Sequence, residues 1–491
     1  PEVEKDVVEE IDKKRMARYR HILVGWDGRQ VSKVCYEAVK RAVHNAGGIA
    51  VDVGITTGPA MLALAAELGY ATIHITASHY SWLYTGIKLT LPGVKPLVDK
   101  YCLREILVRT EKDEFGDDLL MNGKGEVLTG IDINKWYASH VREGFNLSNF
   151  SPCKIAFETF GLSATQETYE CFKDSNTELI NADDVPVVLD YDPGIYGQFN
   201  IPGADSFGAP DPMRRKELNR LRLVIRQQNC DMGIARDGDG DRVFFLDKTG
   251  RVIRADIIFC LVIRRFLKKF PGASILYDVR SSKIVRETIL KYGGRPVLSK
   301  VGHAFILNRM QTEGIALGGE CSGHYYNQYG EIPWYATFMV REELAETGKS
   351  LDEVVAEFEK YFHSDEINGN RNVKNDKFDV CKGDAPAFFE GWAASKGLKI
   401  EKIEYTDGIT IDFGKSWFNL RGSYTEPVVR LVVESSVSRE DLVQLAQAVI
   451  DYMGKYGIKI NIRMFSNNYP ELIRKLSDPV KYNRLADILI N

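Results

Sequence analysis

The stretch at positions 237–242 reads Asp-Gly-Asp-Gly-Asp-Arg, so three carboxylates alternate with glycines and an arginine follows them. A tight loop of this kind can turn Asp237, Asp239 and Asp241 toward one point. Carboxylate oxygens are the ligands that a hard divalent cation such as Mg²⁺ prefers, and three of them leave positions open for water or a substrate oxygen. A calcium-binding EF-hand does not fit, because its loop needs a glycine and a glutamate where this chain has an arginine and a lysine. The pattern predicts a Mg²⁺ site; a solvated acidic turn is the alternative, which the apolar residues on both sides of the loop disfavour.

A second candidate is Thr76-Ala77-Ser78-His79, which directly follows a strand-like run at Ala71–Ile75. A serine after a strand is commonly only a turn residue or a helix cap. Ser78 therefore gains a chemical meaning only in combination with the other polar loops of the chain.

Composition favours a multidomain enzyme that acts on a small polar substrate. With 491 residues, 44% of them hydrophobic, the chain is long enough for roughly three or four domains. A formal net charge of −4, from 64 basic and 68 acidic residues, gives no electrostatic footprint for nucleic acid or an anionic membrane. The eight cysteines include no CxxC pair, which argues against a disulfide framework or a zinc site. Without an apolar run near 18 residues, and with charged first positions, neither a signal peptide nor a membrane span is expected, and we predict a cytoplasmic protein.

Three successive stretches of the chain alternate short β-branched runs with helical periodicity, which is typical of parallel α/β units. In the first stretch the pattern predicts strands at 22–24, 49–53 and 71–75 and helices at 31–43 and 61–68. In the second it predicts strands at 154–157 and 185–189, a helix at 216–228, and a hairpin turned by residues 247–250 after the acidic loop. In the third it predicts helices at 256–269, 284–292 and 305–312 and strands at 274–278 and 296–300.

The last quarter of the chain has a different pattern. Residues 409–413 and 428–433 read as antiparallel strands, and Ser438 is placed to cap a helix that runs from Arg439 to about Met453. This predicts a smaller α+β domain, with a tail at 458–491 that keeps helical periodicity. In α/β sheets ligands gather beyond the carboxyl ends of the strands, so we expect the polar loops to meet there.

The order of these loops closely resembles that of the α-D-phosphohexomutase family over nearly the whole chain. The motifs that carry the resemblance are Asp27-Gly28-Arg29, Thr76-Ala77-Ser78-His79, Tyr84-Thr85-Gly86-Ile87-Lys88, the three aspartates with Arg242, Tyr277-Asp278-Val279-Arg280-Ser281-Ser282, Lys300-Val301-Gly302-His303, Glu320-Cys321-Ser322-Gly323-His324, and Arg421-Gly422-Ser423-Tyr424-Thr425-Glu426-Pro427.

The resemblance implies an α/β fold of three consecutive similar α/β domains with mixed or parallel sheets, plus a smaller α+β C-terminal domain, around a central cleft. On this basis we predict a serine-loop domain at 1–152, a metal-loop domain at 153–253, a sugar-recognition domain at 254–367 and a phosphate-binding domain with a helical tail at 368–491.

The resemblance also implies roles for particular residues. Ser78 would carry a phosphoryl group, and the three aspartates would bind Mg²⁺ that also touches the serine oxygen. Phosphoryl transfer develops negative charge on the equatorial oxygens, which cationic side chains stabilise, and the attacking hydroxyl must lose its proton to an acid/base group such as a histidine. The predicted catalytic set is Ser78, His79, Lys88, Arg29, Arg242, Arg280 and His303, with His303, Arg280 and Lys88 sharing the acid/base and orienting duties.

Two further groups would hold the substrate. Glu320, Ser322 and His324 resemble the loop that hydrogen-bonds the hydroxyls of a pyranose ring. Arg421, Ser423, Thr425 and Arg430 would cradle the phosphate that is not being transferred.

The predicted activity is interconversion of hexose 1-phosphate and hexose 6-phosphate, of glucose and/or mannose, with a hexose 1,6-bisphosphate as intermediate and activator. The only expected partner is the sugar phosphate, bound by a monomer or a weak homo-oligomer. Phosphoglucosamine mutase, a catalytically silent sugar-phosphate-binding relative and a metal-dependent phosphatase remain alternatives. The silent relative is motivated by Tyr80-Ser81, which stand where the family commonly has asparagine and proline, and Arg236 similarly stands where an apolar residue is usual.

Overall fold

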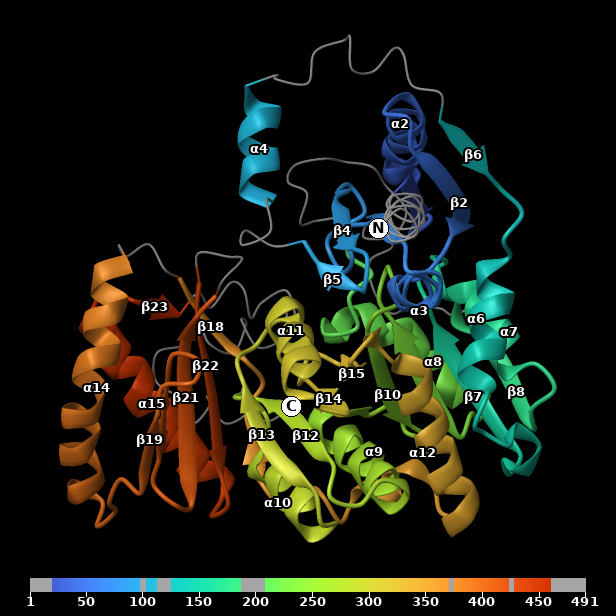
Figure 1. The fold of residues 1–491 in the computed structure, drawn as a ribbon. Helices are drawn as coiled ribbons and strands as arrows, with labels where there is room; N and C mark the ends of the chain where they lie inside the picture. Colours follow the sequence, from blue (N-terminus) through green and yellow to red (C-terminus); the bar gives the residue numbers. More distant parts are fainter. Residues whose placement is uncertain are drawn as a thin grey trace, which may run out of the picture. The chain divides into compact units, whose positions relative to one another are not determined.

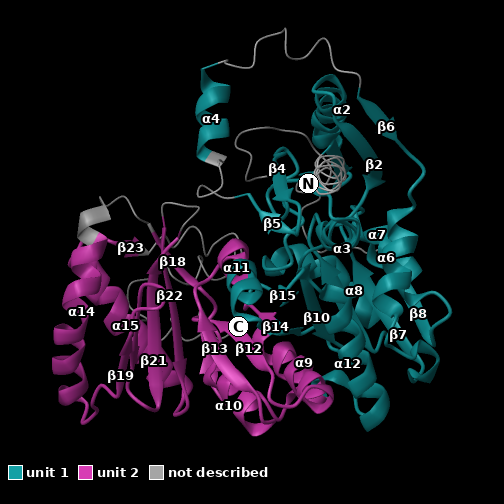
Figure 2. Cartoon of the chain, in the orientation of Figure 1, with its two compact units in different colours: residues 1–255, 307–317, 322–352 teal, residues 256–306, 318–321, 353–491 magenta. Residues whose placement is uncertain are grey.

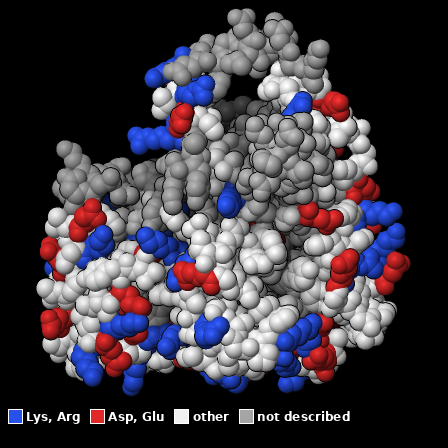
Figure 3. Space-filling view, viewed as in Figure 1, with Lys and Arg blue, Asp and Glu red and all other residues white. Residues whose placement is uncertain are grey.

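The computed structural model describes residues 20–97, 103–112, 125–186, 208–370, 375–423 and 428–460. The chain forms two compact units (Figure 2). Unit 1 contains residues 1–255, 307–317 and 322–352, and unit 2 contains residues 256–306, 318–321 and 353–491. Within the described ranges, no helix combines the length and the apolar character that crossing a bilayer requires. Figure 3 shows acidic and basic side chains interspersed over the described part of the face in view, in keeping with the small net charge.

The first sheet of unit 1 is mixed and has six strands in the order β5-β4-β3-β1-β2-β6, of which β5, β4, β2 and β6 are labelled in Figure 1. β1 pairs in parallel with β2 and β3, whereas β3 pairs in antiparallel with β4. Buried aliphatic side chains, among them Leu23, Val51 and Ile75, hold these strands in the core. The elements predicted for this stretch are confirmed. Their bounds are β1 (His21–Trp26), α2 (Gln30–Asn45), β2 (Ile49–Ile55), α3 (Gly58–Leu68), β3 (Ala71–Ile75), β4 (Ile87–Leu91), β5 (Lys95–Pro96), α4 (Leu103–Glu111), β6 (Glu126–Leu128) and α6 (Ile133–Arg142).

The second sheet of unit 1 has the strand order β11-β10-β9-β7-β8 and carries the acidic loop. β9 and β10 form an antiparallel pair that is buried at every residue, and the acidic loop connects them. β7 pairs in parallel with β8 and β9. The bounds are β7 (Cys153–Glu158), α7 (Ala164–Phe172), β8 (Thr177–Asn181), α8 (Asn219–Gln227), β9 (Met232–Arg236), β10 (Val243–Asp247) and β11 (Val252–Ile253).

One strand prediction in this stretch is wrong. The strand expected at 185–189 is not formed at residues 185 and 186, and residues 187–189 lie outside the described part of the chain. The strand that forms in this stretch is instead β8. It ends at Asn181, whose side chain accepts a hydrogen bond from the backbone N–H of Asp183 at 3.1 Å and caps a short 3₁₀ turn. The apolar run that followed was the stronger β signal in the sequence, and the cap that ends the true strand is a polar one.

Residues 255–313 form the helices and strands predicted for the third stretch. β12 pairs in parallel with β13, and the Ser282 hydroxyl caps α10 by accepting from the backbone N–H of Ile284 at 3.3 Å. After β14, an antiparallel pair of β15 and β16 leads into α12. The bounds are α9 (Ala255–Lys269), β12 (Ser274–Asp278), α10 (Lys283–Lys291), β13 (Arg295–Ser299), α11 (His303–Glu313), β14 (Leu317–Gly319), β15 (Tyr325–Asn327), β16 (Gly330–Glu331), α12 (Pro333–Thr347) and α13 (Leu351–Val355).

The C-terminal part of unit 2 is an antiparallel sheet in the order β19-β20-β21-β22-β18-β23, with β17 also pairing with β22. Helices α14 and α15 lie beside this sheet (Figure 1), and their side chains Phe389 and Val449 share a buried cluster with Phe418 of β21. Ser438 caps α15 as predicted, accepting from the backbone N–H of Asp441 at 3.2 Å. The bounds are β17 (Phe362–His363), β18 (Ile367–Asn370), α14 (Asn375–Ser395), β19 (Lys402–Glu404), β20 (Ile409–Asp412), β21 (Ser416–Gly422), β22 (Val428–Ser435), α15 (Arg439–Gly454) and β23 (Lys459–Ile460).

The tail prediction needs a correction. Lys459 and Ile460 form β23, which pairs with β18, rather than the start of a helix. The rest of the tail, residues 461–491, lies outside the described residues. The predicted fold class, α/β segments with mixed sheets followed by an α+β domain, is confirmed, and the four domain boundaries stay a prediction.

Candidate active site

The acidic loop gathers its three carboxylates in the core of unit 1. Asp237, Asp239 and Asp241 are buried, and one oxygen from each lies within 4.8 Å of the others. Gly238 is required because a Cβ there would lie 2.5 Å from the backbone oxygen of Ser78. Gly240 is required because its φ is +65°, in the left-handed region that favours glycine. The alternation of aspartate and glycine thus brings the carboxylates together and lets the serine loop approach.

The chemistry of this loop fits a divalent cation. Within the described residues, Asp239 Oδ1 accepts no hydrogen bond although it is buried. Burial and the neighbouring Asp241 and Asp239 carboxylates raise the pKa of Asp237 well above its usual value, as expected when like charges are crowded together. Lys88 supplies positive charge, with Nζ 2.6 Å from Asp239 Oδ2 and 2.8 Å from Asp241 Oδ2. Three buried carboxylates of this kind are the donor set that Mg²⁺ takes.

The serine loop points its hydroxyl at this acidic loop. Ser78 Oγ donates to Asp237 Oδ2 at 3.0 Å. The backbone of Ser78 lies in the left-handed region, with φ at +48°. Thr76 Oγ1 stabilises this conformation, because it accepts from the Ser78 N–H at 2.8 Å and donates to Asp27 Oδ2 at 2.9 Å. The structure therefore brings the predicted serine and the predicted metal loop together within unit 1.

Arg29 lies under the serine loop as a clamp. Its Nε donates to Asp27 Oδ2 at 2.8 Å, and its Nη1 donates to the backbone oxygens of Tyr80 and Ser81, each at 2.8 Å. Its Nη2 donates to the backbone oxygen of Ser78. The guanidinium is buried, and these contacts favour a positioning role rather than direct contact with a substrate.

His79 lies beside the serine hydroxyl and contacts Arg242. His79 Nδ1 accepts from Arg242 Nη2 at 2.8 Å and lies 3.3 Å from Ser78 Oγ. Burial and then the Arg242 charge lower the pKa of His79 to about 2, so the imidazole is neutral near pH 7. Arg242 also faces Asp211 and Asp237, each at 3.6 Å. His79 is therefore suited to hold Arg242 in place, not to carry a proton.

One residue predicted to contact the sugar ring, His324, reaches the metal loop, and a second, Ser322, contacts His324. His324 Nε2 lies 3.2 Å from Asp241 Oδ1. Ser322 Oγ lies 2.9 Å from His324 Nδ1 on the other side of the ring. Both side chains can still offer groups to a sugar, and the geometry adds that His324 contacts Asp241 while Ser322 orients the His324 ring.

Behind the acidic loop lies a buried polar network that the sequence did not reveal. Arg236 Nε donates to the backbone oxygen of Arg242 at 3.0 Å, and its Nη2 donates to the backbone oxygen of Gly240. Glu167, which is fully buried, lies 3.5 Å from Arg236 Nη2 and accepts from Trp334 Nε1 at 2.5 Å. Arg236 was visible in the sequence as a departure from the family pattern, whereas no local motif marks its two partners.

In unit 2, Arg280 is held by carboxylates. Its Nη2 lies 2.7 Å from Asp278 Oδ2 and 3.4 Å from Glu320 Oε1. Burial alone would lower the pKa of Arg280, but Asp278, Glu366 and Glu320 raise it well above the usual value. Arg280 is therefore a permanent cation suited to orienting, not to proton transfer. Glu320 Oε1 also accepts from the backbone N–H of Gly302 at 3.0 Å, which places the predicted acid/base His303, the next residue, beside this cluster.

The described residues of unit 2 that are predicted to bind phosphate contact a glutamate, directly or through one another, that the sequence did not reveal. Arg421 Nη2 lies 2.5 Å from Glu366 Oε2, and Arg430 Nη1 donates to Glu366 Oε1. Ser423 Oγ lies 3.4 Å from Arg430 Nη2. Thr425, the remaining predicted member, lies outside the described residues.

The structure thus brings the predicted residues together in two groups, one in each unit. The group in unit 1 is Ser78, His79, Lys88, Arg29, Asp237, Asp239, Asp241, Arg242, Ser322 and His324. The group in unit 2 is Arg280, His303, Glu320, Arg421, Ser423 and Arg430.

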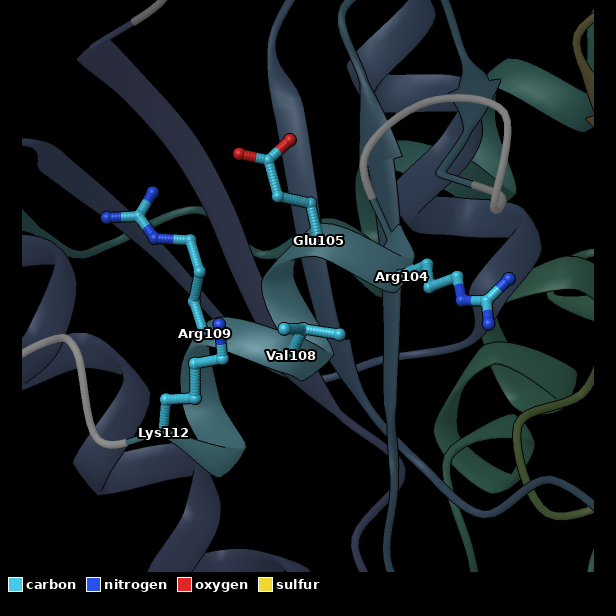
Figure 4. Close-up of a pocket in the computed structure, with 5 residues that line it drawn as sticks. All are labelled: Arg104, Glu105, Val108, Arg109 and Lys112. Carbon is cyan, nitrogen blue, oxygen red and sulfur yellow. The ribbon is translucent and has the colours of Figure 1, made fainter.

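A hollow on α4 does not belong to either group. Among the described residues, those that line it come from one short stretch of the chain, and their side chains spread apart from one another (Figure 4). They are Arg104, Glu105, Val108, Arg109 and Lys112. None of the predicted site residues that the structure describes lines this hollow.

Comparisons with known proteins show the family of this chain. The sequence matches the family models for phosphoglucomutase/phosphomannomutase alpha/beta/alpha domain I over residues 3–116, alpha/beta/alpha domain III over residues 254–361 and the C-terminal domain over residues 343–452. A phosphomannomutase of Escherichia coli is 34% identical over 424 residues, which cover 84% of this chain and 87% of that protein. A phosphomannomutase of Methanocaldococcus jannaschii is 32% identical, with 74% of each chain covered.

A solved structure shows the same fold. The crystal structure of a phosphoglucomutase/phosphomannomutase family protein from Burkholderia thailandensis superposes with a TM-score of 0.73 over 90% of each chain, at 22% identity. These findings define an enzyme that transfers a phosphoryl group, a phosphotransferase of the mutase type. The chain belongs to the phosphoglucomutase/phosphomannomutase family, and it is a phosphohexomutase.

Proposed function

We propose that this phosphohexomutase interconverts mannose 1-phosphate and mannose 6-phosphate, with the glucose phosphates as a second substrate pair, through a phosphoserine at Ser78. The observation that carries the proposal is the 3.0 Å hydrogen bond from Ser78 Oγ to Asp237 Oδ2, which joins the reactive hydroxyl to the predicted metal loop. The preference for mannose is supported by the two relatives named above, which are phosphomannomutases.

In the proposed cycle, the free hydroxyl oxygen of the bound hexose monophosphate attacks the phosphorus of phosphorylated Ser78. A new oxygen–phosphorus bond forms, the bond from Ser78 Oγ to phosphorus breaks, and the hydroxyl proton passes to a base. The hexose 1,6-bisphosphate then turns over, and Ser78 attacks the other phosphate by the reverse chemistry. Net phosphate is conserved, so the reaction needs no other phosphate donor.

The cationic side chains near Ser78 are placed to hold the phosphoryl group. Arg242 and Lys88 both lie against the acidic loop, within reach of groups bound there. Burial alone would lower the pKa of Lys88, but Asp239 and Asp241 raise it well above the usual value, so Lys88 acts here as a charge. A loose phosphoryl-transfer transition state is stabilised mainly by such fixed positive charge.

Asp237, Asp239 and Asp241 would hold Mg²⁺, which supplies further positive charge at the phosphoryl oxygens. Proton transfer is assigned to His303, because an ordinary imidazole titrates close to neutral pH. Glu320, Ser322 and His324 would recognise the ring hydroxyls, and Arg421, Ser423, Thr425 and Arg430 the phosphate that is not transferred.

The first experiment replaces the proposed nucleophile. Ser78→Ala is expected to abolish isomerisation while sugar phosphate binding, measured by calorimetry, persists. Ser139→Ala, in the exposed part of α6, serves as the matched control and should keep full activity. Peptide mass spectrometry of the wild type should find phosphate on Ser78 that is lost on incubation with a hexose 1-phosphate.

The outcomes separate the alternatives. Full activity of Ser78→Ala would disprove the phosphoserine route, and release of free phosphate in excess of isomer would indicate a phosphatase. Paired assays with mannose, glucose and glucosamine 1-phosphates would rank the hexoses. The cytoplasmic location and the monomeric or weakly oligomeric state stay predictions, and light scattering after size-exclusion chromatography tests the second.

A further inference from the structure

Glu366 lies among three arginines of unit 2 and carries no role in the proposed cycle. It is located between β17 and β18, and its side chain is only 11% exposed. Its Oε2 lies 2.5 Å from Arg421 Nη2 and 3.9 Å from Arg280 Nη1. Its Oε1 accepts a hydrogen bond from Arg430 Nη1. One carboxylate therefore bridges two arginines assigned to the phosphate and faces a third.

The strand pairing explains why an anion is needed at this point. Arg421 of β21 and Arg430 of β22 are directly opposite each other in the antiparallel pair. Like charges in this position repel and destabilise the sheet. β18 pairs with the other side of β22, with Asn368 opposite Arg430, so the backbone delivers Glu366 to the arginine pair.

The carboxylate is ionised under working conditions. Burial alone would raise the pKa of Glu366, but Arg421, Arg280 and Arg430 outweigh it and lower the pKa to about 2. At neutral pH the cluster therefore contains a full negative charge within hydrogen-bonding distance of two guanidinium groups.

We propose that Glu366 is an internal anion that competes with the substrate's non-transferred phosphate for Arg421 and Arg430 and so weakens the hold of the loop on that phosphate. The proposal rests on the proposed mutase function, which it deepens by naming the residue that sets phosphate affinity. A phosphate monoester and a carboxylate both use guanidinium N–H groups as charge-assisted donors, so they draw on the same nitrogens.

A moderate affinity suits this reaction. The bisphosphate intermediate must present first one end and then the other, so the loop releases and rebinds a phosphate in every cycle. Arginines without a resident anion would bind each phosphate more tightly and release it more slowly, and release is often the rate-limiting step. Glu366 provides the negative charge that remains when the phosphate leaves.

The test is the sign of the change in phosphate affinity. Glu366→Gln keeps the size of the side chain and removes its charge, and calorimetry of the full-length protein with inorganic phosphate should show binding about tenfold tighter, which is the order of one charge-assisted hydrogen bond. In steady-state assays KM for the hexose 1-phosphate and kcat should both fall. Unchanged or weaker phosphate binding would overturn the proposal, because a carboxylate that merely positions the arginines would lose affinity when removed.

Two further variants complete the design. Glu366→Asp shortens the side chain so that it no longer reaches both arginines, and its phosphate affinity should lie between those of the wild type and Glu366→Gln; affinity equal to or below the wild type again counts against the proposal. Glu404→Gln, a surface glutamate paired with Lys402 at 2.8 Å, changes the net charge equally and should leave binding unchanged. Inorganic phosphate binding is measured without turnover, so failure of the mutase function appears separately, as absent isomerisation by the wild type.

Discussion

Side-chain surroundings, more than residue type, decide what each charged group at this site does. Arg29 and Arg242 are both buried arginines of this site, yet Arg29 donates to one carboxylate and to backbone oxygens of the serine loop, while Arg242 faces carboxylates and an imidazole. The sequence could predict that both belong to the site, because their motifs are local. It could not assign their roles, because those depend on contacts with residues far along the chain.

Arg29→Lys tests the clamp. A lysine has one donor group and cannot replace four hydrogen bonds that point in fixed directions, so the serine loop should shift. We expect kcat to fall by about 100-fold, the effect of a displacement on the order of 1 Å at a reacting group, with little change in KM. The measurement is steady-state kinetics, with Arg41→Lys on the exposed face of α2 as the control. A rise in KM at constant kcat would show instead that Arg29 binds the substrate.

Among the elements, the β9–β10 hairpin is what turns three separated aspartates into one site. Its two strands are buried throughout, so the loop between them has fixed ends. Backbone contacts hold the loop from outside: the N–H of Gly58 donates to the oxygen of Asp239 at 2.8 Å, and Ser163 Oγ donates to the oxygen of Gly238 at 2.9 Å. The aspartates are therefore positioned by neighbouring segments as well as by their own turn.

Gly238→Ala should separate the two reactive loops. The added Cβ would lie 2.5 Å from the Ser78 backbone oxygen, so one of the loops must move. We expect kcat to drop by about 100-fold or more, while the melting temperature changes little. Gly383→Ala in α14 is the matched control, because a Cβ there meets nothing within 4 Å and alanine favours a helix by about 0.5–1 kcal/mol. Wild-type kcat in Gly238→Ala would contradict the close approach.

The buried network of Arg236, Glu167 and Trp334 behind the hairpin should contribute to stability. Arg236→Met leaves the buried Glu167 without its cationic partner, and we expect the free energy of unfolding to fall by about 3–5 kcal/mol. Adding Glu167→Gln should recover part of that loss, because the uncompensated charge is removed. Urea denaturation of the wild type, both single variants and the double variant gives the coupling energy. Additive losses would mean that the two residues do not act as a pair.

For the chain as a whole, the order of helices and strands follows from local periodicity, and for that reason the sequence predicted most of it. Hydrophobic spacing, glycines and caps such as Ser438 act within a few residues. The polar contacts that the sequence did not reveal join residues far apart in the chain. Glu167 and Trp334 are 167 positions apart, and Glu366 and Arg421 are 55 apart, so no local pattern indicates these pairs. What a sequence alone conceals here is the long-range pairing of buried polar groups.

The buried carboxyl of Glu158 should make the free energy of unfolding depend on pH. Burial, and then the Asp183 charge, raise the pKa of Glu158 to about 8. An unfolded glutamate titrates near 4.3, so between about pH 4.5 and 8 the folded state keeps a proton that the unfolded state releases. The stability provided by this protonated carboxyl is present below that window and is lost as the pH rises through it.

Glu158→Gln should remove this dependence. Glutamine keeps an acceptor for the backbone N–H of Phe160, which donates to Glu158 Oε1 at 2.7 Å, and it has no proton to lose. The variant should be more stable than the wild type at pH 8 by roughly 2–4 kcal/mol, and less so toward pH 5. Urea denaturation across this range measures the difference, with Glu178→Gln, an exposed glutamate on β8, as the control. Parallel curves for the wild type and Glu158→Gln would refute the assignment.

Because unit 1 is built from three separate segments of the chain, the order of synthesis affects when it can fold. Unit 1 takes residues up to 255 and then returns for 307–317 and 322–352, so a ribosome must have released most of the polypeptide before unit 1 has all of its parts. Until α12 emerges, the buried Glu167 lacks the indole that donates to it, and a truncated product that stops before α12 would expose that carboxylate. Unit 1 of the nascent chain should therefore become protease-resistant late, after residue 352 has left the exit tunnel.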